Sequence, residues 1–393
     1  MGRPASCGRL AGGGRGGGRA GRRGGGRGRA RAPALQPAGR GPGDGGGGDR
    51  PRSRPGGVMD RPRILFAAPS DASFIRIDRE LLAERWPLEE WRQPGRVTNL
   101  VRLTPMLRRC DLVVGWWASW PTFFPVLLGG ALGKPSLLIV GGFDTANMPE
   151  IGYGFQQGGP RRWLSRAVMR RADRLVTNSH YSRREIEANV GIPAARVRVI
   201  HHGVPDPYGE LPAGQRRRMA LNVGFVTRAN LEIKGQRAFV EAARELPDVE
   251  FVLAGLWKDD AIERLRALAS PNVRFTGWLE RPELDRLFRQ AATYVQPSHH
   301  EGFGLAVAEA MLAGCVPVVT AAGALPEVVG DAGIQVPTDR PADVAAGIRR
   351  ALEEGDGARA RARERVLREF PLELRRRGLY EAIEELWSST QAS

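Results

Sequence analysis

The sequence of 393 residues has little cysteine and, for its charge, very little lysine. Its three cysteines, Cys7, Cys110 and Cys315, are far apart, and none belongs to a CxxC pair or to a Cys/His set with zinc spacing. We therefore expect reduced thiols and no metal centre. Lysine occurs only at positions 134, 234 and 258, against 56 arginines.

The chain also lacks a long hydrophobic run without helix-breaking residues. Residues 112–133 carry no charge and are long enough to span a bilayer, but their interior contains two prolines and three glycines. A strand over 112–116, a short helix over about 121–132 and a strand over 136–140 explain the same residues within a buried parallel sheet, and we favour this interpretation. A second interpretation stays open, in which aromatic residues form a surface for a lipid or sugar acceptor. These residues are Trp116, Trp117, Trp120, Phe123 and Phe124.

The formal net charge of +16 is concentrated at one end of the chain. Residues 1–57 contain 13 arginines, two acidic residues and 22 of the 51 glycines, so the other 336 residues carry only about +5. This composition buries too little apolar surface to fold, and we expect a disordered tail. The tail has no aromatic residue to stack on a base and no apolar stretch of a signal peptide.

Three interpretations of residues 1–57 follow from this composition. An Arg/Gly-rich segment can bind RNA, or it can bind an anionic membrane surface. We favour the third, a translated leader upstream of a start at Met59, because the scarcity of lysine indicates a GC-rich coding sequence. Such a sequence specifies arginine, glycine, alanine and proline when it is translated upstream of its start.

Strand-like runs alternate with helical patterns over the rest of the chain. The first series of strands is expected at 63–69, 112–116, 136–140, 174–179 and 197–204, and the second at 219–226, 249–255, 273–278, 293–298 and 316–321. Alternating strands and helices form parallel sheets that helices cover on both faces. We therefore predict an α/β protein with two Rossmann-like domains facing a central cleft.

A proline-rich join near residues 205–214 separates the two series. The predicted boundaries are a tail over 1–57, an N-terminal domain over 58–212, a C-terminal domain over 213–370 and a final helix over 371–393. The final helix has an apolar face, which must pack on another part of the protein and could lie back across the domains. Its apolar residues are Leu379, Ile383, Leu386 and Trp387.

The stretch "HHEGFGLAVAEAM", residues 299–311, places two glutamates eight positions apart around a glycine turn. We interpret it as a loop followed by a helix, whose N-terminal N–H groups and dipole favour an anion. Glu301 then lies on the loop and Glu309 on the helix. Two carboxylates beside an anion site indicate a ligand that carries hydroxyl groups as well as phosphate, such as a sugar diphosphate.

A second strand-to-helix connection carries two cations. In "LNVGFVTRANLEIKG" a strand ends at Gly224, a loop carries Arg228, and a helix is expected to begin near Lys234. A forked guanidinium and a compact ammonium together suit a diphosphate whose leaving charge must be stabilised. The alternative is that both residues are ordinary solvated cations. This alternative is stronger for Arg228, because arginine is abundant in the chain, than for Lys234, because lysine is scarce.

These stretches, with "FVLAG", "VRFTGWL" and "GALPEVVGDAGIQV" in the same order, carry a resemblance. Together they resemble the C-terminal half of retaining, nucleotide-sugar-dependent glycosyltransferases of the GT-B fold. This is the large family, glycosyltransferase family 4, that includes glycogen and sucrose synthases and bacterial mannosyltransferases. The resemblance is strong over residues 215–340 and weak over 60–214. It implies that the N-terminal domain binds the acceptor and the C-terminal domain binds the donor.

By this resemblance, Glu301 contacts hydroxyls of the donor sugar near the reacting carbon, and Glu309 binds the ribose hydroxyls. Arg228 and Lys234 match the pair that neutralises the diphosphate, so that no divalent metal is required. Backbone N–H groups for the sugar and phosphates are implied at Gly302, Phe303, Gly304 and Leu305. Residues implied to lie beside the nucleotide base are Thr276, Gly277 and Trp278.

The chain departs from the family pattern in its N-terminal half. The first strand-to-helix loop, "APSDASF", lacks the paired glycines common in relatives, and residues 141–149 lack a histidine that relatives often have. Asp144 in that segment either contacts the acceptor or is an ordinary turn residue. His299 and His300 are interpreted as loop residues beside the site, and His201 and its neighbours as a structural turn.

The predicted function is transfer of a sugar from a nucleotide-diphosphate-sugar to an acceptor hydroxyl, with retention and without cofactor or metal. The acceptor is a glycan, a lipid or a small molecule. We expect a cytoplasmic protein, with peripheral contact to the inner face of the membrane left open, and no nucleic-acid partner. The alternatives are an RNA-binding protein that uses its tail, and a sugar phosphorylase or epimerase of the same fold. A phosphorylase needs a pyridoxal-bearing lysine, for which Lys134 and Lys258 have little context.

Overall fold

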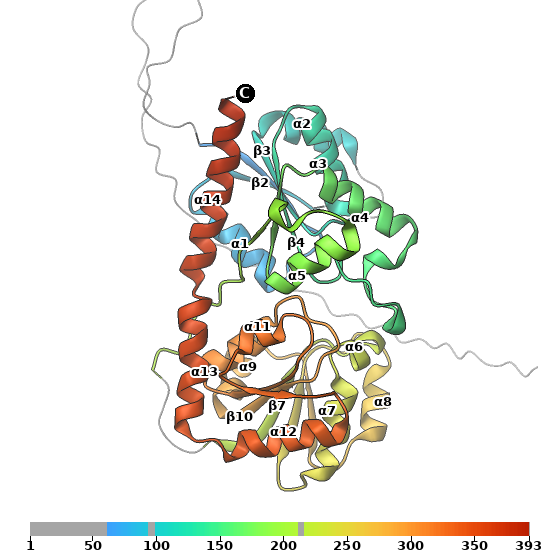
Figure 1. Cartoon of the computed structure of the whole chain (residues 1–393), viewed down its shortest axis with the longest axis vertical. Coiled ribbons are helices and arrows are strands. Elements are labelled where there is room, and N and C mark those ends of the chain that lie inside the picture. Colours follow the sequence, from blue (N-terminus) through green and yellow to red (C-terminus); the bar gives the residue numbers. More distant parts are fainter. Residues whose placement is uncertain (1–60, 93–98, 211–215, 393) are drawn as a thin grey trace, which may run out of the picture. The chain divides into compact units, whose positions relative to one another are not determined.

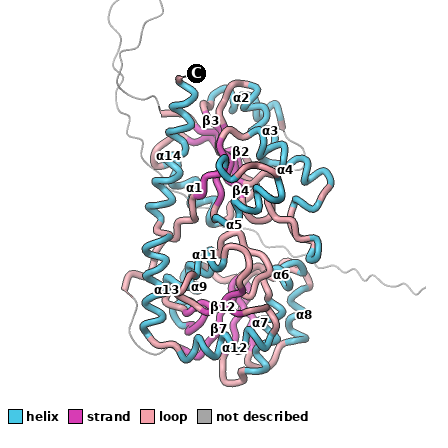
Figure 2. The backbone as a smooth tube through the Cα atoms, in the orientation of Figure 1, coloured by secondary structure: helices cyan, strands magenta, loops and turns pink. Residues whose placement is uncertain are grey.

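The computed structural model describes residues 61–92, 99–210 and 216–392. The predictions for residues 1–57, a disordered tail or a translated leader, lie outside the described residues. Within the described ranges, two six-stranded parallel sheets are each covered by helices on both faces (Figures 1 and 2). The predicted fold class, α/β with two Rossmann-like domains of the GT-B type, is therefore confirmed.

The N-terminal sheet has the strand order β2-β1-β3-β4-β5-β6. Its strands are β1 (Ile64–Ala67), β2 (Leu88–Trp91), β3 (Leu112–Trp116), β4 (Ser136–Val140), β5 (Arg174–Thr177) and β6 (Val197–Val199). The sequence did not predict β2, because "LEEW" has two charged residues among four and no alternation typical of a strand. The strand forms because it pairs with β1 along the edge of the sheet.

Helices cover both faces of this sheet. One face packs against α1 (Ser73–Ala83) and α14 (Leu372–Gln391), and the other against α2 (Leu100–Arg109), α3 (Trp120–Ala131), α4 (Gly159–Arg171) and the π-helical turn Ile186–Val190, which follows α5 (His180–Glu185). The interpretation of residues 112–140 as strand, helix and strand is confirmed. In the described part of the chain, no helix has both the length and the apolar character needed to cross a membrane.

The final helix, α14, belongs to the core of the N-terminal sheet, although it follows the C-terminal domain in the sequence (Figure 1). Leu379, Ile383 and Leu386 are buried on its inner side. Arg375 forms a two-pronged ion pair with Asp78 of α1, with N–O distances of 2.9 and 2.6 Å and both side chains inaccessible to solvent. The apolar face and this ion pair hold the last helix on α1.

The C-terminal sheet has the strand order β12-β11-β10-β7-β8-β9. Its strands are β7 (Arg217–Val223), β8 (Glu250–Ala254), β9 (Val273–Gly277), β10 (Ala291–Gln296), β11 (Val316–Thr320) and β12 (Ile334–Val336). The chain proceeds outward from β7 to β9 and then returns to place β10 on the other side of β7. The connections after β7 and β10 therefore leave the same edge at a topological switch point, where sheets of this kind bind ligands.

Eight α-helices accompany this sheet in the described ranges. One face packs against α9 (Arg281–Gln290), α10 (Leu305–Leu312), α11 (Leu325–Val329) and α13 (Asp356–Glu369). The other packs against α6 (Arg228–Ile233), α7 (Gln236–Ala242), α8 (Ala261–Leu268) and α12 (Pro341–Glu353). The two buried faces position the loops at the switch point.

Candidate active site

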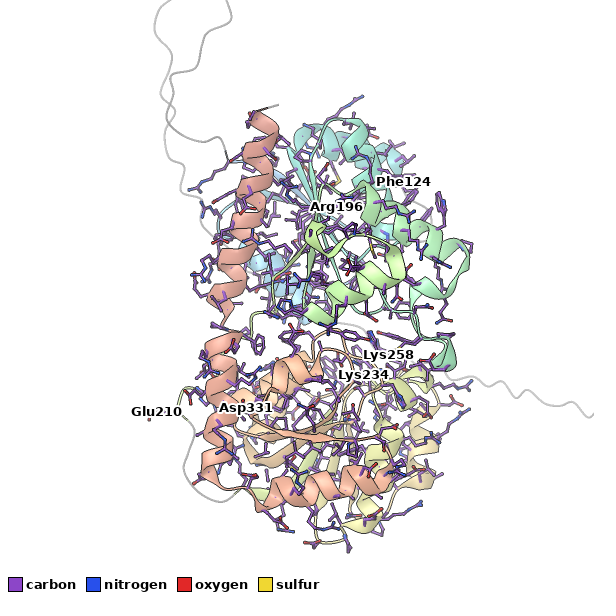
Figure 3. All side chains as sticks on the ribbon, in the orientation of Figure 1. Phe124, Arg196, Glu210, Lys234, Lys258 and Asp331 are labelled. Atoms are coloured by element: carbon purple, nitrogen blue, oxygen red, sulfur yellow. The ribbon has the colours of Figure 1, made fainter. Side chains whose placement is uncertain are left out.

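Lys234 and Glu301 meet at the switch point of the C-terminal sheet. Lys234 follows α6 in the connection after β7, and Glu301 lies on the loop after the neighbouring strand β10. The Lys234 ammonium forms an ion pair with the Glu301 carboxylate, and the Gln296 amide donates a hydrogen bond to the same carboxylate at 2.6 Å. Figure 3 shows Lys234 at one end of the C-terminal domain. Two predicted site residues that are 67 positions apart are thus in direct contact.

The turn after Lys234 requires glycine. Gly235 has a φ angle of +61°, and a Cβ atom at this position would lie 2.0 Å from the carbonyl oxygen of Pro297. The connection between α6 and α7 can therefore pack directly against the end of β10. This close approach brings the Lys234 side chain to Glu301.

The glycine turn of the EGFG stretch lies at the start of α10, as predicted. Gly304 is the residue before the helix, and Leu305 begins it. The first turn of α10 has neither a side-chain cap nor an acidic residue, so its backbone N–H groups and the positive end of the dipole suit an anion. Phe303 is buried against the rings of His202 and Phe370, at centroid distances of 5.1 and 5.2 Å. Its side chain therefore supports the turn, and only its backbone can serve a ligand.

Glu309 lies in α10 and pairs with an arginine that the sequence analysis missed. The Arg281 guanidinium contacts Glu309 at 2.6 Å and Asp285 at 2.9 Å, and the Tyr208 hydroxyl donates to the same Asp285 oxygen at 2.8 Å. Burial raises the pKa of the Glu309 carboxyl above its ordinary value, and Arg281 opposes this rise. No sequence signal marked Arg281, because it is one of 56 arginines and its partner is 28 positions away.

The structure corrects the expectation for Arg228. The residue begins the short helix α6 and does not lie on a loop. Its guanidinium is held by both carboxylate oxygens of Asp260, at 2.5 and 2.6 Å, and its backbone N–H donates to Asp259 at 2.9 Å. The sequence missed α6 because six residues between a strand and a glycine give too little pattern to distinguish a helix from a loop. Arg228 and Lys234 thus have separate carboxylate partners in this structure.

The residues implied to lie by the nucleotide base are at the end of β9. Thr276 and Gly277 are its last residues, and Trp278 follows with 59% of its surface exposed. The Trp278 indole N–H donates to Glu280 at 3.2 Å. An exposed ring at the carboxyl end of a strand is available to a flat ligand, and the assignment of a base to this position stays a prediction.

The EGFG loop also contacts the N-terminal domain. The carbonyl oxygen of Gly302 accepts hydrogen bonds from the hydroxyls of Ser179 at 2.8 Å and Ser182 at 3.3 Å. A Cβ at Gly302 would lie 3.1 Å from the backbone of Gly142, so this approach favours glycine. The loop that carries Glu301 is therefore held from both domains.

Asp144 is buried, and both of its carboxylate oxygens are engaged. They accept backbone N–H groups of Ala118 at 2.9 Å and Gly141 at 3.0 Å. Burial raises the pKa of this carboxyl to about 7, against these two hydrogen bonds, which lower it. These two hydrogen bonds link the loop after β3 to the loop after β4, so the geometry favours a structural role for Asp144. Contact with an acceptor stays a prediction.

The histidines pair with carboxylates across the site. His299 contacts Asp339 at 2.7 Å, and the buried His300 contacts Glu185 of the N-terminal domain at 3.0 Å. His201 contacts Glu327 of α11 at 2.6 Å.

One group in the described part of the chain has side chains that can ligate a metal. His180, His201 and Glu327 place their ligand atoms within 4.8 Å of one another. Both oxygens of Glu327 already accept the backbone N–H of His180 at 3.0 Å, and one also accepts the His201 ring. These hydrogen bonds already engage both oxygens of the Glu327 carboxylate, so no metal ion is needed to explain its position.

The arrangement is that of a two-domain sugar-transfer enzyme of the GT-B class. Two Rossmann-like domains meet at a loop where a lysine, a glutamate and a helix N-terminus converge. Comparison with known proteins agrees with this class. A family model described as "Glycosyl transferases group 1" matches residues 220–354, and one described as "Glycosyltransferase Family 4" matches residues 60–206. Together they match more than half of the chain, which belongs to this glycosyltransferase family.

Several relatives are similar over part of their length. The O-antigen chain mannosyltransferase B of Escherichia coli is 30% identical over 196 residues, which cover 46% of this chain and 51% of that protein. A glycogen synthase of Mycobacterium tuberculosis is 31% identical over 254 residues, covering 59% and 60%. The matches thus span about half to three fifths of these relatives. Among solved structures, Anabaena Alr3699/HepE in complex with UDP and glucose aligns with a TM-score of 0.66 and 17% identity, covering 83% of this chain and 100% of that one.

Proposed function

We propose that the protein transfers a sugar from a nucleoside-diphosphate-sugar to an acceptor hydroxyl with retention of configuration and without a divalent metal. The observation that carries this proposal is the Lys234–Glu301 ion pair beside the N-terminus of α10, with Glu309 eight residues further on. This set offers a cation and backbone N–H groups for phosphate and two carboxylates for hydroxyls. The relatives named above and the family support a transferase.

Each residue of the set has a distinct role in this proposal. Glu301 accepts hydroxyls of the donor sugar, and Glu309, held by Arg281, accepts the ribose hydroxyls. Lys234 and the first N–H groups of α10 face the diphosphate, where negative charge develops as the bond to the sugar breaks. Arg228 joins them when a diphosphate competes with Asp260 for its guanidinium. The exposed Trp278 lies beside the base.

The reaction itself needs little covalent chemistry from the protein. The bond between the anomeric carbon and the diphosphate oxygen breaks, and the acceptor oxygen forms a bond to that carbon on the same face. The proton of the acceptor hydroxyl passes to the departing phosphate oxygen. The protein contributes position, exclusion of water and stabilisation of the leaving charge.

The direct test compares transfer by wild type with transfer by Lys234→Ala and Glu301→Ala. Removal of one preorganised group that stabilises developing charge typically costs roughly 100- to 1,000-fold in kcat, and we expect losses of this size with unchanged folding. Lys134→Ala is the matched control, because it removes the same charge from the turn before β4 in the other domain. Near-normal turnover in either site variant would refute the assignment of the site.

The donor is found by a thermal-shift series with UDP, GDP, ADP and their sugar conjugates. UDP comes first, because the Anabaena neighbour was solved with UDP and glucose. A ligand at about 100 times its Kd adds roughly 2.7 kcal/mol to the stability of the folded state, or about 5–10 °C for a domain of ordinary size. With the donor identified, the anomeric configuration of the product by NMR tests retention, and activity in excess EDTA tests metal independence.

No specific observation favours the other two functions. The RNA-binding hypothesis depends on residues 1–57, which lie outside the described residues. The phosphorylase or epimerase hypothesis shares the fold, but the matched relatives named above are a mannosyltransferase and a glycogen synthase.

A further inference from the structure

Large aromatic side chains lie on the outer side of α3 and α4. Trp120, at the start of α3, is 39% exposed, and Trp163 of α4 is 66% exposed. Phe123 connects them, because its ring lies 5.9 Å from Trp120 and 5.8 Å from Trp163, centroid to centroid. Phe124 packs edge-on against Phe123 at 5.1 Å. The four rings therefore form one cluster across two helices, a feature typical of interaction surfaces rather than of scattered exposed residues.

A row of arginines lies beside this cluster. Arg162, Arg166 and Arg170 recur every fourth residue along α4, and the helix "GPRRWLSRAVMRR" has no acidic residue. Like charges at this spacing destabilise a helix. Burial lowers the pKa of Arg166, and the charges of Arg162 and Arg170 lower it further.

The partners of these arginines do not neutralise them. Arg166 donates to the Gln156 side chain and to the Asn189 carbonyl, and Arg170 donates to the Val190 carbonyl at 3.3 Å. Within the described ranges, no carboxylate pairs with the three arginines of this row. The positive charges of the row are therefore not balanced by carboxylates of the described residues, and an anionic partner can balance them.

The arginines and the tryptophan face the same way. A shallow hollow of about 320 Å³ lies along α4, lined by Gly159, Arg162, Trp163, Arg166, Ala167 and Arg170. Their spacing of three and four residues places them on one side of the helix. This side belongs to the face of the N-terminal sheet opposite α14, and Phe124 lies there, away from α14 (Figure 3).

We propose that this α3–α4 surface docks the protein on a bilayer that contains anionic lipids. The surface consists of Trp120, Phe124, Arg162, Trp163, Arg166 and Arg170. Tryptophan rings favour the headgroup region of a bilayer, and arginines can extend to lipid phosphates while their stems cover apolar surface. The proposal does not depend on the proposed transferase activity.

A bilayer fits this surface better than single-stranded nucleic acid does. Bases stack on open ring faces, but Trp120 and Phe123 already stack on each other with an interplanar angle of 7°. The arginine row runs from residue 162 to residue 170, a rise of about 12 Å along the helix, which is short for a groove that follows a nucleic-acid backbone.

The test measures partition of the full chain onto vesicles of phosphatidylcholine with and without roughly one third phosphatidylglycerol, at near-physiological salt. The double variant Arg162→Gln/Arg170→Gln should lower the partition coefficient onto anionic vesicles about 30-fold, from about 1 kcal/mol for each basic residue at the surface. The matched control is Arg349→Gln/Arg350→Gln on α12, where both arginines are exposed. It removes the same charge and should leave partition within about twofold, because only charges close to the membrane surface contribute.

The aromatic part is tested with Trp163→Ala, against Leu367→Ala, which removes another exposed apolar side chain on α13. The tryptophan variant should lower partition several-fold, and the leucine variant should not. Equal partition of wild type and the arginine double variant would overturn the proposal and assign any vesicle binding to the rest of the chain. A double variant that loses affinity for single-stranded RNA but not for vesicles would overturn it in favour of a nucleic-acid surface. Thermal unfolding of each variant excludes loss of fold as the cause.

Discussion

Replacement of Arg281 by glutamine tests whether the neighbouring guanidinium keeps the Glu309 carboxylate charged for its ligand. The Glu309 side chain is 17% exposed, and its pKa is raised by burial even though Arg281 lies 2.6 Å away. A carboxyl whose pKa is raised in the folded state becomes anionic only above that higher pKa. Without Arg281 the pKa of Glu309 rises further, so the anion that accepts ribose hydroxyls forms only at higher pH.

The magnitude follows from the exposure of the two side chains. Breaking a fully buried ion pair by removing one partner costs about 3–5 kcal/mol. Arg281 is 48% exposed, so solvent screening reduces the effect, and we expect about 1–2 kcal/mol. In nucleotide affinity this corresponds to an increase in Kd of roughly 5- to 30-fold at neutral pH.

Calorimetric titration over a range of pH with the nucleoside diphosphate that stabilises wild type measures both effects. Affinity should fall as the solution becomes acidic, and in Arg281→Gln the midpoint of this fall should lie at a higher pH than in wild type. Arg286→Gln is the control, because it removes an exposed arginine from the same helix. An unchanged Kd with an unmoved midpoint would refute the role given to Arg281.

Three further predictions concern stability and site geometry. Arg375→Ala leaves Asp78 buried without its cationic partner, with the Trp116 indole N–H still donating to it at 3.0 Å, and should lower the free energy of unfolding in urea by about 3–5 kcal/mol. For Asp144, with a pKa of about 7 against 3.8, stability is greatest below the lower value and declines as pH rises through 7. Asp144→Asn should remove this decline, which between about pH 5 and about pH 8 is at most about 2.5–3 kcal/mol, when urea unfolding is compared at these two values. Gly235→Ala forces a left-handed residue against Pro297 and should cost at least about 1–2 kcal/mol in thermal unfolding. It should also reduce transfer, because the Lys234 side chain is displaced.

Each of these variants has an outcome that contradicts its argument. A loss below about 1 kcal/mol in Arg375→Ala would mean that the ion pair is replaced by solvent at little cost. An unchanged slope of stability with pH in Asp144→Asn would show that another group titrates. Full activity in Gly235→Ala would show that the close approach does not position Lys234.

Much of the fold could be predicted from local pattern. The runs at β3, β4, β8 and β11 are mainly apolar, and the structure has strands there. Elements with little local pattern were missed. β2 has two glutamates and forms through edge pairing with β1, and α6 has six residues.

The site shows the same division between local and distant information. The Glu301 loop and the helix that carries Glu309 are neighbours in the chain, so a glycine turn followed by an apolar run was enough to predict their arrangement. Arg281 could not be found in this way. Its significance comes from contact with Glu309, which requires α9 and α10 to lie on the same face of the sheet.

By itself, the sequence determined that strands alternate with helices and that the sheets are parallel. It also determined that a glycine turn follows Glu301 and precedes the helix that carries Glu309. These properties depend on residues within about one helix or strand of each other, where periodicity and turn chemistry act directly. The tertiary structure alone decided which charges are paired: Lys234 with Glu301, Arg281 with Glu309, and Arg228 with Asp260. These partners are 28 to 67 positions apart, and only the strand order of the C-terminal sheet and the helix packing on its faces bring them into contact.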